Sequence, residues 1–160
     1  FMITTQRFLL KPLTIDDVNH RYLSWLNLKT SAYIEYVKSH SSIEELKNYV
    51  SERENRQDVL FLGIFTKEAQ HIGNIKYEPI DSKSKSAVMG ILIGDNDWRG
   101  KGVATEVIKA SGGYLAEQYG IETIILGVNE SNKAAVAAYQ KVGFKVKEHN
   151  QSGIQMTWKL

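Results

Sequence analysis

The sequence predicts a mixed α/β domain in which helices flank a central, mostly antiparallel sheet. Its 160 residues, 42% of them hydrophobic, are enough for one domain with a sizeable core. Three apolar stretches rich in β-branched residues follow one another with short turns between them, which is typical of antiparallel strands. Beyond them the apolar residues recur at helical spacing. No repeat or linker interrupts the chain, so we expect residues 1–160 to form a single domain.

Local signals along the chain define the expected elements. Thr14, with Asp17 three residues later, has the spacing of a capping box, and Ser41 with Glu44 repeats it. Asn27–His40 is polar and aromatic without a clear period, which indicates a functional loop or a short irregular helix. The expected helices run from Thr14 to about Leu26, from Ser41, from Val103 and over Lys133–Val142, and the expected strands are Ile3–Lys11, Val59–Thr66, Ile72–Ile80, Ala87–Ile93, Thr123–Val128, Phe144–Lys147 and Ile154–Lys159.

Glycines mark both C-terminal helices. Gly112 and Gly113 lie inside the helix that begins at Val103, where each costs about 1 kcal/mol relative to alanine. We therefore expect close backbone packing or a kink at this pair. Gly143 follows Lys133–Val142 at the position where a left-handed residue commonly ends a helix.

The composition argues against several function classes. The formal net charge is +2 and the basic residues are scattered, so nucleic acid is not an expected partner. The longest mainly apolar stretch, Ala87–Gly94, is far shorter than the roughly 20 residues of a membrane-spanning helix. Cysteine is absent and we find no secretory signal, so we expect a cytoplasmic location. The histidines lack metal-ligand spacing, so we expect no metal: His20, His40, His71 and His149.

The most informative segment is Ile91–Ala104, where an apolar strand passes through a glycine-rich turn into a helix. The first N–H groups of a helix have no partners within it, and the helix dipole favours an anion there. Gly100 and Gly102 would let the backbone approach phosphate oxygens closely. The segment does not fit the dinucleotide-binding fingerprint, because Thr105 stands where its third glycine is required, and the glycine spacing excludes a Walker loop.

Arg99–Ala104 resembles the Arg/Gln-x-x-Gly-x-Gly/Ala signature of the GNAT superfamily of N-acetyltransferases. The likeness continues through Asn129–Ala135, Tyr139 and Gly143-Phe144, which are similar to the family's Asn-x-x-Ala, Tyr and Gly-Phe segment. The N-terminal half is similar to the branch that includes ribosomal-protein, polyamine and amino-sugar acetyltransferases, through Arg7–Leu13 and Tyr22–Asn27.

The resemblance implies a GNAT-like fold, with a splay between the fourth and fifth strands, and acetyl-CoA as co-substrate. It implies that the turn holds the pyrophosphate of coenzyme A, that strand amides and Asn132 bind the pantetheine arm, and that Tyr139 protonates the departing thiolate. The seven-residue spacing of Asn132 and Tyr139 independently places both on one helix face. The candidate cofactor-binding residues are Ile91, Leu92, Ile93, Arg99, Gly100, Lys101, Gly102, Val103, Ala104, Thr105 and Asn132.

The general base is where the sequence departs from the family pattern. Many relatives have a glutamate where this sequence has Gly127, and Ala87–Ile93 contains no acid. The proton of the acceptor amine would then leave through water to Glu35, Glu78 or Asp95, or the neutral amine would bind directly.

The sequence does not decide the identity of the acceptor, and the candidates are amino sugars, polyamines and protein N-termini. Its expected walls are Asn27–His40 and Asp81–Ser86, because loops on a rigid scaffold commonly carry specificity. The partners expected are acetyl-CoA and an amine, with a homodimer left open. The rival reading is a non-catalytic acyl-CoA-binding or regulatory module of the same fold, which Gly127 favours and Tyr139 opposes.

Overall fold

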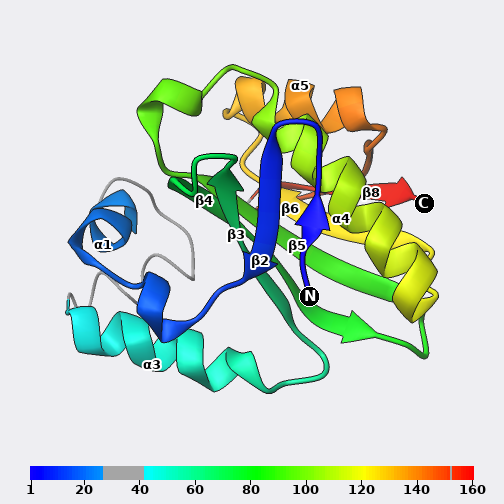
Figure 1. Cartoon of the computed structure of the whole chain (residues 1–160). Helices are drawn as coiled ribbons and strands as arrows, with labels where there is room; N and C mark the ends of the chain where they lie inside the picture. Colours follow the sequence, from blue (N-terminus) through cyan, green and yellow to red (C-terminus); the bar gives the residue numbers. More distant parts are fainter. Residues whose placement is uncertain (27–41, 152) are drawn as a thin grey trace.

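The computed structural model describes residues 1–26, 42–151 and 153–160, whose eight strands form one sheet in the order β1-β2-β3-β4-β5-β6-β8-β7. Within these described ranges, four α-helices and two short 3-10 helices connect the strands (Figure 1). The elements are β1 (Ile3–Thr4), β2 (Phe8–Pro12), η1 (Ile15–Asp17), α1 (His20–Leu26), α3 (Ile43–Glu54), β3 (Leu60–Thr66), β4 (His71–Asp81), β5 (Ser86–Ile93), η2 (Asn96–Trp98), α4 (Val103–Tyr119), β6 (Thr123–Val128), α5 (Lys133–Val142), β7 (Lys145–Asn150) and β8 (Gly153–Lys159).

Strands β5 and β6 are the only parallel neighbours in the described sheet. Parallel neighbours need a crossover connection, and α4 supplies it. Pairing between these strands is limited to Ser86–Val88 with Thr123–Ile125, although both strands continue beyond those residues. The predicted splay is therefore confirmed.

Two hydrophobic clusters cover the two faces of the sheet. Successive side chains of a strand point to opposite faces, so Leu62 and Ile64 join one cluster while Phe61 joins the other. The first cluster packs under α4 and α5, and the second under α1 and α3, which lie on opposite sides of the sheet (Figure 1). In the described part of the chain, no helix combines the length and apolarity needed to span a membrane.

The N-terminal strand differs from the prediction. Ile3–Lys11 forms two strands, because the chain turns at Thr5 and pairs Ile3–Thr4 with Leu9–Leu10. The Thr5 N–H donates to the Phe8 carbonyl at 2.9 Å and closes this turn. The turn lies in the polar stretch Thr4–Arg7, which contains neither glycine nor proline.

The predicted helix starts are also corrected. Thr14 does form a capping box with Asp17, but the box begins the short η1, and α1 begins only at His20. The side chain that caps α3 is that of Ser42, one residue later than predicted, and it accepts from the Glu45 N–H. The prediction for Asn27–His40 lies outside the described residues.

The glycine pair in α4 has two different environments. A Cβ on Gly112 would lie 2.7 Å from Cζ3 of Trp158, so the predicted close packing is confirmed there. A Cβ on Gly113 would meet nothing within 4 Å. Gly143 ends α5 with a φ of 129°, and its N–H donates to the Tyr139 and Gln140 carbonyls. That cap is as expected.

We predict opposite effects on stability from alanine at these two neighbouring positions. Gly113→Ala should raise the free energy of unfolding by up to about 1 kcal/mol, through helix propensity alone. Gly112→Ala should lower it, because overpacking against Trp158 costs about 1–3 kcal/mol and exceeds that gain. Urea denaturation of both variants checks this, and an equal stabilisation by both would contradict the packing argument.

Candidate functional site

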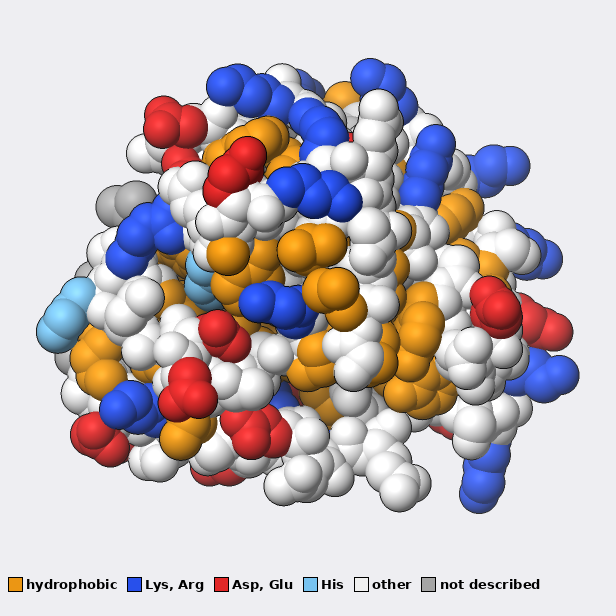
Figure 2. All heavy atoms as spheres, in the orientation of Figure 1, with side chains coloured by type: hydrophobic (Ala, Val, Ile, Leu, Met, Phe, Trp, Pro, Cys, Tyr) orange, Lys and Arg blue, Asp and Glu red, His pale blue; other side chains and the backbone are white. Residues whose placement is uncertain are grey.

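The turn between β5 and α4 presents free backbone amides. Gly100 and Gly102 have φ angles of 71° and 77°, which are left-handed values that favour glycine. The space beside Gly100 is empty to 4 Å. No acceptor among the described residues takes the N–H groups of residues 100–105. Lys and Arg side chains gather over this end of the molecule (Figure 2). The turn can therefore bind an anion through its amides and the α4 dipole.

Arg99 holds this turn against the strand that precedes it. Its Nε donates to the Ile93 carbonyl at 3.1 Å, and the side chain is partly buried. Asp95 caps η2 by accepting from the Asp97 N–H at 2.9 Å. These bonds fix the path of the turn, so the two glycines are held at the start of α4.

Beyond the last parallel pair, alternate backbone groups of β5 face the β6 side without a partner on β6. The Lys85 carbonyl accepts from the Thr123 N–H, so odd-numbered residues of β5 direct their backbone groups toward β6. Ile91 and Ile93 therefore face the open side, beyond the last parallel pair. Leu92, which pairs with β4, directs its backbone groups the other way. Of the three strand residues predicted to bind a cofactor, Ile91 and Ile93 face the open side, and the Ile93 carbonyl there accepts from Arg99 Nε.

Tyr139 lies on the face of α5 that packs against the first hydrophobic cluster. Its ring makes an edge contact with Phe144, with 5.9 Å between the ring centroids. Among the described residues, none is hydrogen-bonded to its phenol. Burial raises the pKa of Tyr139 above its ordinary value of 10.0, so the phenol stays protonated at neutral pH. The group can donate a proton.

Asn132 has a structural task that the sequence analysis did not assign to it. It is the N-cap of α5, and its Oδ1 accepts from the Ala135 N–H at 3.3 Å. The side chain is exposed at the start of the helix that carries Tyr139. Capping uses the carbonyl oxygen only, so the amide NH₂ can still donate to a ligand.

Two glycines leave bare backbone on the α3 face of the sheet, just past the last parallel pair. Gly90 and Gly127 each lie two residues beyond that pair, Val88 with Ile125. Both are exposed, and a Cβ on either would meet nothing within 4 Å. Lys76 lies directly opposite Gly90 on β4. We call Gly90 and Gly127 the bare glycine pair.

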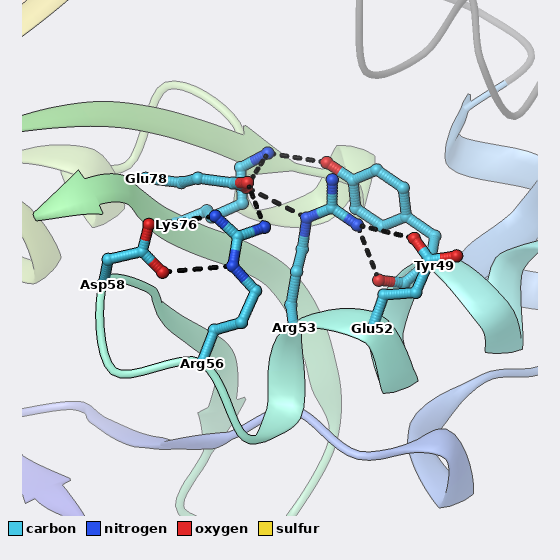
Figure 3. A network of polar contacts seen from close by, with 7 residues as sticks. All are labelled: Tyr49, Glu52, Arg53, Arg56, Asp58, Lys76 and Glu78. Atoms are coloured by element: carbon cyan, nitrogen blue, oxygen red, sulfur yellow. Dashed lines mark hydrogen bonds and ion pairs between the residues drawn. The ribbon is translucent and has the colours of Figure 1, made fainter.

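Glu78, one of the predicted proton acceptors, lies in an ionic network between α3 and β4 (Figure 3). Its carboxylate receives Arg53 Nε at 2.9 Å, Arg56 Nη1 at 3.0 Å and Lys76 Nζ at 3.3 Å. Burial alone would raise the pKa of Glu78, but the hydrogen bond from Arg53 and the nearby cations bring it below its ordinary value. Such a carboxylate is a weak base.

The neighbours of Glu78 complete the network. Lys76 donates from Nζ to the Tyr49 hydroxyl at 2.6 Å, and burial lowers the pKa of Lys76. Arg56 also pairs with Asp58, whose Oδ2 lies 3.0 Å from its Nη2. The network thus joins α3 and the α3–β3 connection to β4, which suits a structural role.

The other two predicted proton acceptors are placed differently. Asp95 accepts from Arg21 Nη2 at 2.8 Å and from Gln70 Nε2 at 3.1 Å, besides capping η2. Glu35 lies outside the described residues. No described cluster of three or more His, Cys, Asp or Glu side chains could hold a metal ion.

Sequence reasoning missed a second anchor of the glycine turn. Glu106, in the first turn of α4, accepts from the Thr5 hydroxyl at 2.6 Å, the Arg7 N–H at 2.8 Å and Arg7 Nε at 2.7 Å. These partners lie about a hundred positions apart, so no local pattern could have joined them. The only available signal was an acidic residue in the first turn of a helix.

Comparison with known proteins identifies the family. Residues 7–145 match the family model described as the acetyltransferase (GNAT) domain. A search of curated proteins gave no match.

Solved structures share the fold at low sequence identity. The ribosomal-protein alpha-N-acetyltransferase RimL, in complex with coenzyme A, is 16% identical, with a TM-score of 0.85 over 100% of this chain and 97% of that chain. A dodecameric spermidine N-acetyltransferase from Vibrio cholerae is 20% identical, with a TM-score of 0.78 over 95% of this chain and 93% of that chain. The PaiA N-acetyltransferase from Thermoplasma acidophilum, in complex with coenzyme A, is 23% identical, with a TM-score of 0.73 over 96% of this chain and 99% of that chain.

The family model covers most of the chain, and the fold matches as well. The open β5 edge, the glycine turn and the protonated Tyr139 agree with that match. The chain belongs to the GNAT family of acetyltransferases.

Proposed function

We propose that this protein transfers the acetyl group of acetyl-CoA directly to a primary amine, on an amino sugar, a polyamine or a protein N-terminus. The observation that carries the proposal is the glycine turn with its free amides beside the unpaired edge of β5. The sequence has no cysteine, so a covalent thioester on the enzyme is excluded, and we propose transfer within a ternary complex.

The donor binds, in this proposal, along the end of β5 and across the turn. The N–H groups of residues 100–105 receive the pyrophosphate, and the backbone groups of Ile91 with the N–H of Ile93 receive the pantetheine amides as an added strand would. The exposed amide of Asn132 contacts the same arm. Leu92 contributes through the pairing that holds β5 on β4. The remaining residues of the proposed acetyl-CoA site belong to the turn and the start of α4: Arg99, Gly100, Lys101, Gly102, Val103, Ala104 and Thr105.

The transfer needs a proton donor at the leaving sulfur and an electrophilic carbonyl. The amine nitrogen attacks the thioester carbon, and the carbon–sulfur bond breaks as the phenol of Tyr139 gives its proton to the sulfur. The elevated pKa of Tyr139 keeps the proton in place until then. Unpaired N–H groups of β5 are placed to stabilise the negative charge that develops on the carbonyl oxygen.

The attacking amine loses its proton to water in this proposal. Gly127 carries no carboxylate, and Glu78 is already surrounded by three cations. Asp95 is engaged by Arg21 and Gln70. We propose that solvent at the exposed bare glycine pair takes the proton.

The acceptor approaches from the α3 face, where the bare glycine pair leaves room beside the divergence of β5 and β6. Tyr139 belongs to the cluster on the opposite face. Donor and acceptor would therefore meet from two sides at the splay. The segments Asn27–His40 and Asp81–Ser86 are the proposed determinants of acceptor choice.

We further propose a cytoplasmic location, because a chain without cysteine suits a reducing compartment. A homodimer is compatible with the proposal and is not needed for it, since one chain supplies every residue named above. The rival function, a non-catalytic acyl-CoA-binding or regulatory module of the same fold, is favoured by Gly127 alone.

Release of free coenzyme A tests the proposal against this rival. The purified protein is incubated with acetyl-CoA and, in turn, amino sugars, polyamines and peptides with free N-termini. Mass spectrometry then identifies the acetylated product. We expect turnover with one class, whereas tight acetyl-CoA binding without turnover on any class would support the rival.

Tyr139→Phe should lower kcat by about a hundredfold or more, because it removes only the proton donor. Acetyl-CoA binding should change little, since the ring and its contact with Phe144 remain. Rates are measured under conditions where chemistry limits turnover, and the dissociation constant by calorimetry. Wild-type kcat in the variant would reject the assignment.

No single acid should be indispensable for deprotonating the acceptor. Glu35→Gln, Glu78→Gln and Asp95→Asn should each lose at most about tenfold in kcat, roughly 1.4 kcal/mol. The rate should rise with pH in every variant, because a free amine with a lysine-like pKa is mostly protonated at pH 7. A loss above about a thousandfold, together with loss of the pH dependence and intact acetyl-CoA binding, would identify that residue as the base.

Glu78→Gln should instead lower stability. The pKa of Glu78 is lowered in the folded state, so its contribution is present above the ordinary value of 4.5 and lost as the pH falls through the lowered pKa. The difference from wild type should therefore disappear in acid. Glu52→Gln is the matched control. Glu52 is exposed, and its Oε2 makes only a long contact of 3.7 Å with Arg53 Nη1, so this change should leave the unfolding free energy nearly unchanged.

A further inference from the structure

The hairpin between β1 and β2 is held to the first turn of α4 by one carboxylate. Both oxygens of Glu106 are used, since Oε2 accepts from the Thr5 hydroxyl and the Arg7 N–H while Oε1 accepts from Arg7 Nε. Burial alone would raise the pKa of Glu106, but the bonds from Thr5 and Arg7 bring it below its ordinary value. Glu106 is therefore ionised at neutral pH and keeps the hairpin against α4.

This contact uses only one of the three guanidinium nitrogens of Arg7. Neither Nη atom donates a hydrogen bond to a described residue. The Nη2 atom lies 3.6 Å from the position that a Cβ would take on Gly102. The guanidinium edge that stays free thus borders the glycine turn, at the N-cap of α4.

We infer that Arg7 is a phosphate-binding residue of the donor site, which contacts the pyrophosphate of acetyl-CoA from the β1–β2 hairpin. The inference rests on the proposed function of the glycine turn. A guanidinium makes strong, directional hydrogen bonds to phosphate oxygens, and here two Nη groups are available for them. The amides of the turn are uncharged, so Arg7 would supply a full positive charge that they lack.

The role of Glu106 in this arrangement is to position Arg7. An arginine side chain loses considerable rotamer entropy when a ligand orders it. The bond from Nε to Glu106 and the contact with the Phe8 ring, 5.0 Å from the guanidinium carbon to the ring centroid, order Arg7 before any ligand arrives. Preorganisation of this kind increases affinity by lowering the entropic cost of binding.

Calorimetry of acetyl-CoA binding to wild type and to Arg7→Gln tests the inference. The variant should raise the dissociation constant at least tenfold, equivalent to 1.4 kcal/mol. The affinity of the variant for inorganic pyrophosphate, measured by competition with acetyl-CoA, should fall by a similar factor. Arg7→Lys should lose less than Arg7→Gln, because it keeps the charge while giving up the paired geometry.

Two control variants separate phosphate binding from a purely structural contact. Thr5→Val removes a bond to the same Glu106 carboxylate but leaves the Arg7 guanidinium, and Lys67→Gln removes a cation that donates to the Thr5 carbonyl. Both should keep the dissociation constant within about twofold of wild type. Thermal midpoints of the unliganded variants report how far each change loosens the hairpin.

The outcomes are distinct. A twofold or smaller effect of Arg7→Gln, or an equal loss in Thr5→Val, would overturn the inference and leave the contact structural. Gly102→Val, which fills the turn itself, should weaken binding by at least tenfold whatever Arg7 does. If the wild type does not bind acetyl-CoA, or if Gly102→Val binds normally while folded, the proposed donor site fails instead.

Discussion

The early separation of β5 from β6 is the constraint on which the candidate site depends. Only three residue pairs join these strands, and the unpaired part of β5 leads directly into the glycine turn. Because parallel neighbours need a crossover, the chain passes from the end of β5 through η2 and the glycine turn into α4. One feature of the sheet therefore brings an unpaired strand edge, a set of free amides and a helix N-terminus to the same place. Each alone is common, and their adjacency makes a site for an extended anionic ligand.

Other contacts hold in place the elements that surround this candidate site. Arg99 bonds back to Ile93, and Glu106 joins the start of α4 to the β1–β2 hairpin. The Glu78 network fastens α3 to β4 on the opposite face. The bonds of Arg99 and Glu106 fix the backbone around the turn, so that its amides need not be ordered when a ligand binds. The ordering cost has already been met during folding.

The sequence predicted the features that depend on near neighbours in the chain. The glycine turn, the Gly143 cap and the alternating strands each have a local cause, and the splay came from family resemblance. The single strand predicted over Ile3–Lys11 was wrong, because the chain turns at Thr5 within the polar stretch Thr4–Arg7, which has no glycine or proline to mark a turn. The prediction that Ser41 caps α3 was wrong, because Ser42 with Glu45 has the same capping-box spacing one position later. The bonds of Glu106 and Glu78 could not be predicted, since they join segments that only the fold brings together.

The position of the bare glycine pair bears on why an acetyltransferase could work without a carboxylate on β6. A glutamate at Gly127 would project from the α3 face, onto the space beside Gly90. Without that side chain the space is open to solvent, and a protonated amine can lose its proton to water there. A fixed base increases the fraction of neutral amine only when its own pKa suits the task, and Glu78, with three cations around it, does not meet that condition. In the proposed mechanism no side chain takes the proton of the amine, so amines with a low pKa should be the faster substrates.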